Sequence, residues 1–365
     1  MHNRRKFIKQ AALHSGAVLM SSHLMSFKQT GKPLGIALVG LGNYATHQLA
    51  PALLQTKKCK LSGIVTGTPE KAEKWSSQYA ISKKNIYNYQ NFDTIKDNPE
   101  IDIVYVVLPN SMHAEYTIRA AQAGKHVICE KPMALNSTEC RAMIKACAGA
   151  GVQLSIGYRL YFEPHHLEMT RLGTEKIYGK VKMIESSLGF SMANPKVWRL
   201  NKALGGGGAI MDLGVYCIQG ARRTIGELPS AVTAQGFVID NTVFKDIYEG
   251  MTFQMEFPGG AISNSTTTYS SYVDRLHATS GYQWFGLSPC YNATGASGQY
   301  FDGAIKPLKF QTPEFQQIAQ MDNFSECIQN NRKSEASGEE GWIDLKIIEA
   351  IVKSADTGHK VKLTW

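Results

Sequence analysis

The 365-residue sequence lacks the features that mark several special classes of protein. No run approaches the ~20 consecutive apolar residues of a membrane-spanning helix. The 33 glycines and 13 prolines follow no repeat, and charged residues make up an ordinary 19%. These absences exclude a collagen-like, disordered or coiled-coil chain. Since a domain has ~100–200 residues, we expect a soluble protein of two domains, without membrane contact in its mature form.

The sequence also lacks the cysteine patterns of a metal site or a disulfide scaffold. Its seven cysteines form no C-x-x-C motif and no Cys/His cluster with zinc spacing. We therefore expect no metal ion, and buried cysteines that act as small hydrophobic side chains. His165 and His166 are adjacent, so they would point apart on a helix, and we place them at the surface or at the rim of a pocket.

The body of the chain has little excess charge of either sign. Residues 1–32 carry six of the nine net positive charges and no acidic residue. A basic tail on a nearly balanced body argues against nucleic-acid binding. The pair Arg4-Arg5 precedes a modest apolar stretch and resembles a twin-arginine export signal, which predicts a periplasmic protein. The alternative for residues 1–32 is an N-terminal arm on a cytoplasmic protein.

A dinucleotide-binding pattern begins directly after this tail. The apolar run 34–39 leads into Gly40-Leu41-Gly42-Asn43-Tyr44-Ala45, and a segment of helical length follows. In this strand–turn–helix context Gly40 permits the tight turn, Gly42 lets the backbone approach a pyrophosphate, and Ala45 permits close packing. The N-terminus of the following helix would then face the phosphates.

The end of the second strand, at 60–66, favours NADP over NAD. An NAD enzyme usually has an acidic residue there, which binds the ribose 2′-hydroxyl. This chain instead reads Thr66-Gly67-Thr68-Pro69-Glu70-Lys71, with no acid at the strand end. Thr66 and Lys71 suit a 2′-phosphate, whereas Glu70 facing the ribose would favour NAD.

The two halves of the chain have different strand patterns. Strands at 101–108, 126–130 and 152–157 alternate with helices at 69–80, 111–123 and 137–150, which predicts a doubly wound parallel sheet of the Rossmann type. Later strands at 181–188, 231–239, 248–257, 261–269 and 274–280 follow one another directly, and helices return at 315–329 and 342–357. We expect an α/β protein with a Rossmann domain at 33–157 and an α+β domain at 158–365. The second domain should have a mainly antiparallel open sheet, with C-terminal helices packing back.

Two segments carry candidate chemistry. Glu130-Lys131-Pro132 follows a predicted parallel strand, and ligands of open α/β sheets bind at that edge. Lys131 can donate to a substrate hydroxyl or act on a neighbouring group through its charge. Asp212 and Tyr216 follow a run of four glycines and lie four residues apart, so they would share one face of a helix.

These segments resemble the Gfo/Idh/MocA oxidoreductase family, most closely its glucose–fructose oxidoreductase branch. The resemblance rests on residues 124–132 (GKHVICEKP), 108–113 (LPNSMH), 157–159, 162–164, 198–201, 205–216 and 338–341. It implies that Lys131, Asp212 and Tyr216 are catalytic. It also implies a group of cofactor-binding positions, which are Gly40, Gly42, Asn43, Tyr44, Ala45, Thr66, Gly67, Lys71, Leu108, Pro109, Asn110, His113, Glu130, Lys131, Arg159, Trp198 and Arg199.

The same resemblance implies an activity. That branch holds NADP tightly, oxidises an aldose at its anomeric carbon and passes the hydride on to a second carbonyl sugar. In that scheme Tyr216 takes the hydroxyl proton, the Lys131 charge makes Tyr216 a better proton acceptor, and Asp212 orients a sugar hydroxyl. The alternatives are a sugar or glycoside dehydrogenase with exchangeable NAD(P), an NAD-dependent glycoside hydrolase, or a cofactor-binding protein without turnover.

The second-domain sheet also suggests an assembly. An open sheet exposes one face, and symmetric oligomers commonly use such a face. We expect a homodimer or homotetramer formed through this sheet, with small sugars as the only other partners.

Overall fold

The computed structural model describes residues 31–192, 194–291, 295–311 and 313–365. The chain divides into two units, Met1–Lys32 and Pro33–Trp365, and the described helices and strands all lie in the second. The predicted export segment with Arg4 and Arg5 lies outside the described residues. Within the described residues, no helix has both the length and the apolar character needed to cross a membrane.

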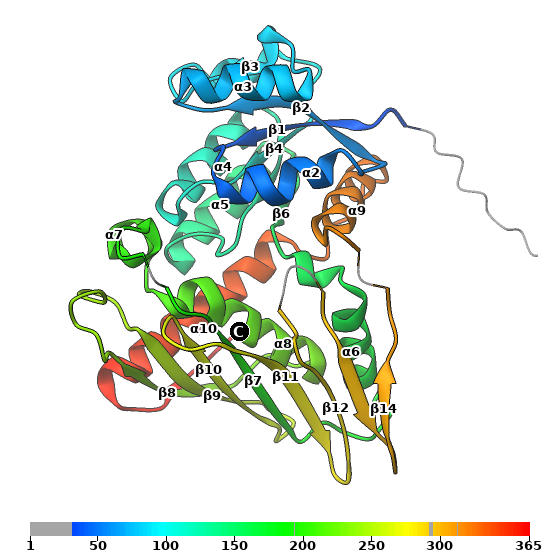
Figure 1. Cartoon of the computed structure of the whole chain (residues 1–365), viewed down its shortest axis with the longest axis vertical. Helices are drawn as coiled ribbons and strands as arrows, with labels where there is room; N and C mark the ends of the chain where they lie inside the picture. Colours follow the sequence, from blue (N-terminus) through cyan, green and yellow to red (C-terminus); the bar gives the residue numbers. More distant parts are fainter. Residues whose placement is uncertain (1–30, 193, 292–294, 312) are drawn as a thin grey trace, which may run out of the picture. The chain divides into compact units, whose positions relative to one another are not determined.

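The first half forms a six-stranded sheet in the order β3-β2-β1-β4-β5-β6, with every neighbouring pair parallel (Figure 1). The central strands are apolar on both faces, as expected for a sheet covered on both sides. The predicted doubly wound sheet is therefore confirmed. The strands are β1 (Leu34–Val39), β2 (Cys59–Val65), β3 (Ile86–Tyr87), β4 (Ile103–Val106), β5 (His126–Cys129) and β6 (Leu154–Ile156).

The helices that connect these strands begin close to their predicted positions, with two differences. The segment after the glycine turn is a π-helical turn followed by a short α-helix, and the short strand β3 was not predicted because two residues give no periodic signal. The elements are η1 (Ala45–Leu49), α2 (Ala50–Leu53), α3 (Pro69–Tyr79), η2 (Lys83–Asn85), η3 (Phe92–Asp97), η4 (Asn110–Met112), α4 (His113–Gln122) and α5 (Ser137–Gly149).

The second half forms a nine-stranded sheet in the order β14-β13-β12-β11-β7-β10-β9-β8-β15. Only the β7–β10 pair is parallel, so the prediction of a mainly antiparallel sheet is confirmed. The strands are β7 (Met183–Gly189), β8 (Ala231–Phe237), β9 (Gly250–Glu256), β10 (Ile262–Thr268), β11 (Val273–Ser280), β12 (Gln283–Leu287), β13 (Gly298–Phe301), β14 (Ile305–Leu308) and β15 (Val361–Lys362). The sequence did not reveal β12 to β15.

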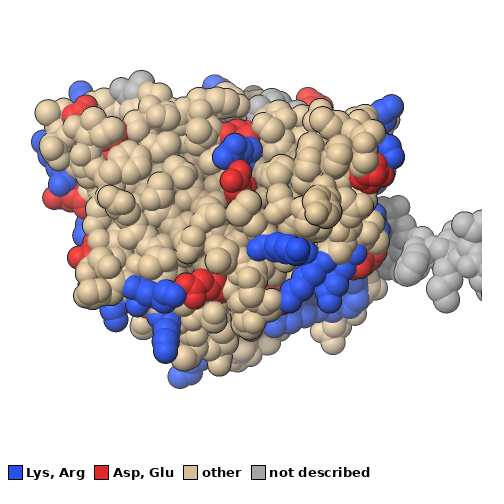
Figure 2. Space-filling model, turned by 90° about the horizontal axis from the view of Figure 1, so that it is seen from below, with Lys and Arg blue, Asp and Glu red and all other residues tan. Residues whose placement is uncertain are grey.

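Helices cover one face of this sheet (Figure 1). Helix α8 packs on β7, β10 and β11, α10 packs on β8, and α6 packs on β12. The other face carries exposed side chains such as Met183 and Ile262. Viewed from the end that holds the sheet, broad areas of the surface carry no charged residue (Figure 2). The helical elements of this half are η5 (Arg159–Tyr161), α6 (Pro164–Thr174), η6 (Trp198–Leu200), α7 (Lys202–Gly205), η7 (Ile210–Gly214), α8 (Val215–Ile225), α9 (Gln317–Gln329) and α10 (Gly338–Thr357).

Helix α9 returns from the second sheet to the first. Its Met321 and Phe324 are buried in the same core cluster as Ile36 and Leu38 of β1. The Asp322 carboxylate accepts hydrogen bonds from backbone N–H groups in the loop before β2. Helix α9 thus becomes part of the six-stranded half, and it brings a row of glutamines to the edge where the parallel strands end.

Candidate active site

The six-stranded sheet presents Lys131 at the carboxyl end of β5. Its ammonium donates to the Asp212 carbonyl oxygen at 2.6 Å and to Asp212 Oδ1 at 2.7 Å. Burial works to lower the pKa of Lys131, but the Asp212 charge and neighbouring groups outweigh it, so the pKa is raised. Lys131 is therefore a charged donor. Two of its three N–H groups have acceptors in the described chain, and the third can serve a substrate hydroxyl.

Glu130 lies beside this lysine and points into the protein. The Tyr105 hydroxyl donates to Glu130 Oε1 at 2.7 Å, and the Lys131 backbone N–H donates to Oε2 at 3.1 Å. Burial raises the pKa of Glu130, although Tyr105 and the Lys131 charge act in the opposite direction. Since a Cβ on Gly157 would lie 2.6 Å from Oε1, the carboxyl group occupies a closely fitted space.

Asp212 is the anionic centre of the site. Its Oδ1 accepts from Lys131, and its Oδ2 accepts from the Tyr269 hydroxyl at 3.0 Å and lies 3.2 Å from Arg199 Nε. Burial favours the neutral acid, but Lys131 and then Arg199 prevail and lower the pKa of Asp212 to about 2. The carboxylate is thus ionised, and its main contacts hold two cations in place.

Tyr216 lies in the first turn of α8 and is buried. The Lys131 ammonium lies over its ring at 4.7 Å from the centroid, and the Arg159 guanidinium carbon lies at 5.3 Å. The Tyr291 ring packs at 5.8 Å between centroids. Lys131, Asp212 and Tyr216, predicted from two distant segments, therefore meet in one place.

The glycine turn has the backbone geometry that its sequence predicts. Gly40 has φ of +95°, and a Cβ there would lie 2.5 Å from the Val107 carbonyl oxygen, so only glycine fits. A Cβ on Gly42 would meet no protein atom within 4 Å. Space at Gly42 beside a crowded Gly40 is the arrangement that lets a ligand approach the backbone.

The side chains at the end of β2 gather beside this turn. The Lys71 ammonium donates to the Leu41 carbonyl oxygen at 3.2 Å, and the Thr66 hydroxyl accepts from the Thr68 backbone N–H. Gly67 lies against the Tyr89 ring. A cation and two hydroxyl groups with no acid at the strand end fit a 2′-phosphate on the ribose.

Other predicted cofactor positions lie along the same edge but make contacts within the protein. Both ring nitrogens of His113 bond to backbone oxygens, those of Leu108 and Pro132. The Asn110 side chain donates to the Gly205 carbonyl oxygen, which ties the first half to the glycine loop of the second. Trp198 lies under the Arg199 guanidinium at 4.6 Å. Pro109 flanks η4, Asn43 is exposed, and Ala45 is buried.

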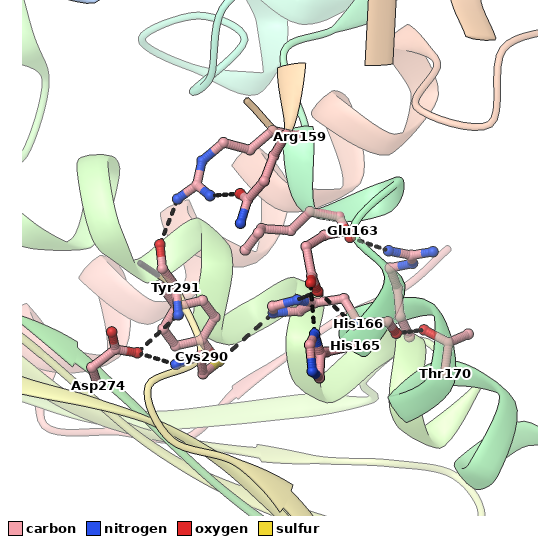
Figure 3. Close-up of polar contacts among 11 residues, drawn as sticks. Arg159, Glu163, His165, His166, Thr170, Asp274, Cys290 and Tyr291 are labelled. Carbon is pink, nitrogen blue, oxygen red and sulfur yellow. Dashed lines mark hydrogen bonds and ion pairs between the residues drawn. The ribbon is translucent and has the colours of Figure 1, made fainter. Parts of the chain in front are cut away.

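Arg159 is buried and joins three segments, as Figure 3 shows. Its guanidinium donates to the Gln316 side-chain oxygen and to the Tyr291 carbonyl oxygen. The Asp274 carboxylate in turn accepts from the backbone N–H groups of Cys290 and Tyr291. The resemblance implied a cofactor contact for Arg159, and the structure places its guanidinium beside the Tyr216 ring.

The two adjacent histidines were expected at the surface or at the rim of a pocket; the surface position is wrong, whereas His166 does line a small cavity next to Tyr216. His165 and His166 are buried in α6, and both direct Nδ1 to the carboxylate of Glu163, one to each oxygen at 2.8 Å (Figure 3). Glu163 also caps the helix by accepting from the His166 backbone N–H. A single carboxylate between two imidazoles explains how all three polar groups can be buried. In the described residues, no group of three or more His, Cys, Asp or Glu is arranged to hold a metal ion.

The sequence did not reveal several supporting residues of the site. Tyr269, directly after β10, reaches Asp212, and Tyr105 from β4 reaches Glu130. Helix α9 contributes three buried glutamines: Gln316 contacts Arg159, Gln317 donates to the Tyr44 hydroxyl, and Gln320 donates to the Tyr105 hydroxyl. The signal in the sequence was three glutamines at helical spacing beside an apolar stripe. The seven cysteines are all buried and free, as expected.

Family models match nearly all of the described chain. Residues 34–158 match an oxidoreductase family with an NAD-binding Rossmann fold, residues 166–298 match a GFO/IDH/MocA C-terminal domain, and residues 294–363 match an oxidoreductase-family C-terminal alpha/beta domain.

Individual relatives match over most of their length. The crystal structure of an aldose-aldose oxidoreductase from Caulobacter crescentus, complexed with glycerol, is 40% identical with a TM-score of 0.89, over 91% of this chain and 100% of that one. A D-xylose 1-dehydrogenase [NADP(+)] of Haloarcula marismortui is 26% identical over 92% of this chain and 94% of its own. A levoglucosan dehydrogenase, 21% identical with a TM-score of 0.77 over 92% of this chain and all of its own, shares the fold. The domain matches and the 40% identity together show that this chain belongs to the GFO/IDH/MocA family of oxidoreductases.

Proposed function

We propose that the protein is an NADP-dependent sugar oxidoreductase that couples oxidation of one sugar to reduction of another. The observation that carries this proposal is that Lys131, Asp212 and Tyr216 contact one another at the carboxyl edge of the six-stranded sheet. The 40% identical relative is named an aldose-aldose oxidoreductase, and another relative is named as an NADP(+) enzyme acting on D-xylose. Both names fit a sugar CH–OH group as the substrate.

The residues along the edge of the sheet fit NADP. The Gly40 turn and the open space at Gly42 suit the pyrophosphate, and Thr66 and Lys71 suit the 2′-phosphate. NADP, when bound, accepts a hydride from the anomeric carbon of an aldose and returns it to a second carbonyl sugar. NAD, the less favoured cofactor, would leave the Lys71 cation without a phosphate to contact.

The protein's own groups handle the proton and the positioning. The third N–H of Lys131 donates to the oxygen of the reacting carbon, and Asp212 holds that ammonium in place. The Tyr216 oxygen, in its deprotonated form, takes the proton that leaves this oxygen, and the hydroxyl so formed returns a proton to the second sugar. Because the proton and the two electrons both return, the cycle needs no net exchange with solvent.

A dehydrogenase with an exchangeable cofactor is the second candidate. The D-xylose 1-dehydrogenase relative favours it, since its name pairs one sugar with NADP(+). This enzyme would use the same three residues but release its reduced cofactor after each turnover. The two candidates therefore differ in cofactor retention.

The test is to purify the protein without added cofactor and record the near-ultraviolet absorbance of reduced nicotinamide. The coupled reaction predicts bound NADP that becomes reduced when an aldose is added and is reoxidised by a second sugar. Empty protein that reduces added NADP with an aldose supports the exchangeable dehydrogenase. A lack of reduction with any aldose, with or without NADP, contradicts both candidates.

We further propose that two copies associate through the outer face of the nine-stranded sheet. This face exposes Met183 and Ile262 on adjacent strands and carries ring contacts between His277 and Trp284 and between Trp284 and Phe301. The broad uncharged areas in Figure 2 agree with an isologous contact. Ile262→Lys should convert the assembly to monomers in light scattering, whereas the same change at exposed Leu54 on the other half should not.

Export to the periplasm is the corresponding proposal for the N-terminal segment. A twin-arginine route carries folded proteins, so the cofactor could be loaded before export. Replacing Arg4 and Arg5 by lysine should retain the protein in the cytoplasm when cell fractions are compared. Unchanged fractionation would favour the cytoplasmic alternative.

A further inference from the structure

Two cations lie over the ring of Tyr216, the partly buried Lys131 and the buried Arg159, but their partners differ. Lys131 forms an ion pair with Asp212 at 2.7 Å. Among the described residues, the Arg159 guanidinium donates to the neutral Gln316 amide and to the Tyr291 carbonyl oxygen, and it also has a hydrogen bond to Tyr216. Arg222, another buried arginine of this half, is instead paired with Glu340 and Asp344. Arg159 is thus a buried charge whose hydrogen-bond acceptors carry no charge, which is a costly arrangement unless a counter-charge can form nearby.

The groups around Arg159 show where that counter-charge would form. Burial lowers the pKa of Arg159, but the electrostatic influence of Tyr216 and Tyr44, together with a hydrogen bond to Tyr216, raises it overall. The carboxyl group of Glu130 also acts on Arg159, but its own burial raises its pKa and so favours its neutral form. The Tyr216 oxygen is therefore the site at which a negative charge would gain most from Arg159.

We infer that Arg159 is a positioning residue: its guanidinium orients the Tyr216 hydroxyl and stabilises the oxygen after proton loss, and Gln316 holds the guanidinium without neutralising it. This inference rests on the proposed function, in which Tyr216 takes the substrate proton. It assigns to Arg159 the electrostatic task that the sequence suggested for Lys131, whose charge Asp212 already pairs. It also gives α9 a part in the chemistry, because Gln316 lies at its N-terminus.

The other charged and titratable groups around Tyr216 do not duplicate this role. They are Lys131, Tyr44 and Tyr291 on the site side, and His166 and Arg223 in the small cavity behind the ring. Burial lowers the pKa of His166, so its imidazole is neutral near pH 7. Arg223 is directed to the ring of Tyr161 and to the Leu160 carbonyl oxygen.

The decisive variant is Gln316→Glu, which keeps the size of the side chain but supplies a carboxylate to Arg159. A base that takes the substrate proton gives a rate of sugar oxidation that rises with pH as the base loses its own proton. If the Arg159 charge promotes proton loss from Tyr216, neutralising that charge should shift the rising part of the pH–rate profile to higher pH by ~1 unit, while the rate at high pH is kept. Arg159→Met should shift this part of the profile to still higher pH. Arg159→Lys, which restores the charge, should give a profile closer to that of the wild type.

A readout without turnover makes the test independent of the sugar. The ultraviolet difference between wild type and Tyr216→Phe reports ionisation of Tyr216 in the protein purified without substrate. In a Gln316→Glu background this difference should develop at higher pH. The control Ser325→Ala, on the same helix, removes a hydroxyl that donates to the Met321 carbonyl oxygen and should change neither curve.

Each outcome separates the inference from the proposed function. If sugars reduce the bound cofactor but neither Gln316→Glu nor Arg159→Met shifts the pH–rate profile or the ultraviolet curve, Arg159 has a structural role only and the inference is wrong. If no sugar reacts at any pH, the proposed function fails, while the ultraviolet curves still report on Arg159. A uniform loss of rate at every pH, with unmoved curves, also overturns the inference.

Discussion

The two sheets contribute to the site in different ways. The six-stranded sheet presents residues at the ends of its parallel strands, where local turns fix Gly40, Thr66 and Lys131. The nine-stranded sheet presents Asp212 and Tyr216 from helical elements that lie on its face, and side chains from the segments between distant strands hold them. Backbone geometry therefore positions the site residues of the six-stranded sheet. Networks of polar side chains position those of the nine-stranded sheet. Substitutions in the two halves should therefore have different effects on activity and stability.

The largest expected effect tests whether the two halves act as one unit. Lys131→Met and Tyr216→Phe should each lower the rate of sugar oxidation by ~10²–10⁴-fold, since each removes a donor or proton acceptor at the reacting oxygen. The double variant should be little slower than the slower single variant, as for groups that act together. Steady-state rates of the folded variants measure this. Fully multiplicative losses would show that the two sheets contribute independently.

The next prediction compares two glycines of the six-stranded half, one that the backbone conformation requires and one that leaves room for a ligand. Gly40→Ala should lower the free energy of unfolding by ~2–4 kcal/mol, because it combines a positive φ with a Cβ 2.5 Å from the Val107 oxygen. The added Cβ of Gly42→Ala would meet no protein atom within 4 Å, so this change should leave the free energy of unfolding nearly unchanged and weaken NADP binding instead. Thermal unfolding and cofactor titration measure the pair. Equal loss of stability in both would contradict the geometry.

The third prediction concerns a buried polar network in the other half. Hydrogen bonds from His166 and His165 outweigh the effect of burial and lower the pKa of Glu163 to about 2, below its ordinary 4.5. A carboxyl group with a depressed folded-state pKa stabilises the fold above pH 4.5 and loses that contribution as the pH falls toward 2. The contribution is at most ~3 kcal/mol.

Glu163→Gln should therefore destabilise the protein at pH 7, and its difference from the wild type should shrink near pH 3. Chemical unfolding at the two pH values measures this difference. Glu175→Gln, an exposed carboxylate just after the same helix, serves as the matched control and should change little at either pH. A difference for Glu163→Gln that stays constant from pH 7 to pH 3 would show that the ionised carboxylate is unimportant.

The smallest effect is expected on the exposed sheet face. Arg275 lies 3.4 Å from Glu185, and both side chains are largely in contact with solvent. Such pairs contribute less than ~1 kcal/mol, so Arg275→Gln should barely change the unfolding midpoint. If it changes the association of subunits in sedimentation, this face is a contact between copies. A large loss of stability in the monomer would instead contradict the exposure of this pair.

Much of the six-stranded half could be predicted because its signals are local. Apolar strands, a glycine turn and a strand-end Glu-Lys-Pro lie in continuous segments, so periodicity and turn chemistry identified them. The histidine pair shows the limit of such reasoning, because adjacency on a helix implied exposure, yet one buried carboxylate serves both rings. The short strands β12 to β15 were missed because their pairing depends on partners rather than on their own sequence.

The sequence by itself determined the family, the parallel sheet, the glycine turn and the identity of Lys131, Asp212 and Tyr216 as candidates. Only the tertiary structure decided what surrounds them. It pairs Lys131 with Asp212 and places Arg159 beside Tyr216. It also packs α9, with its glutamines, against the six-stranded half, although α9 is distant in sequence. The physical reason is that charge pairing and burial depend on distances between remote segments, whereas strands and turns depend mainly on neighbouring residues.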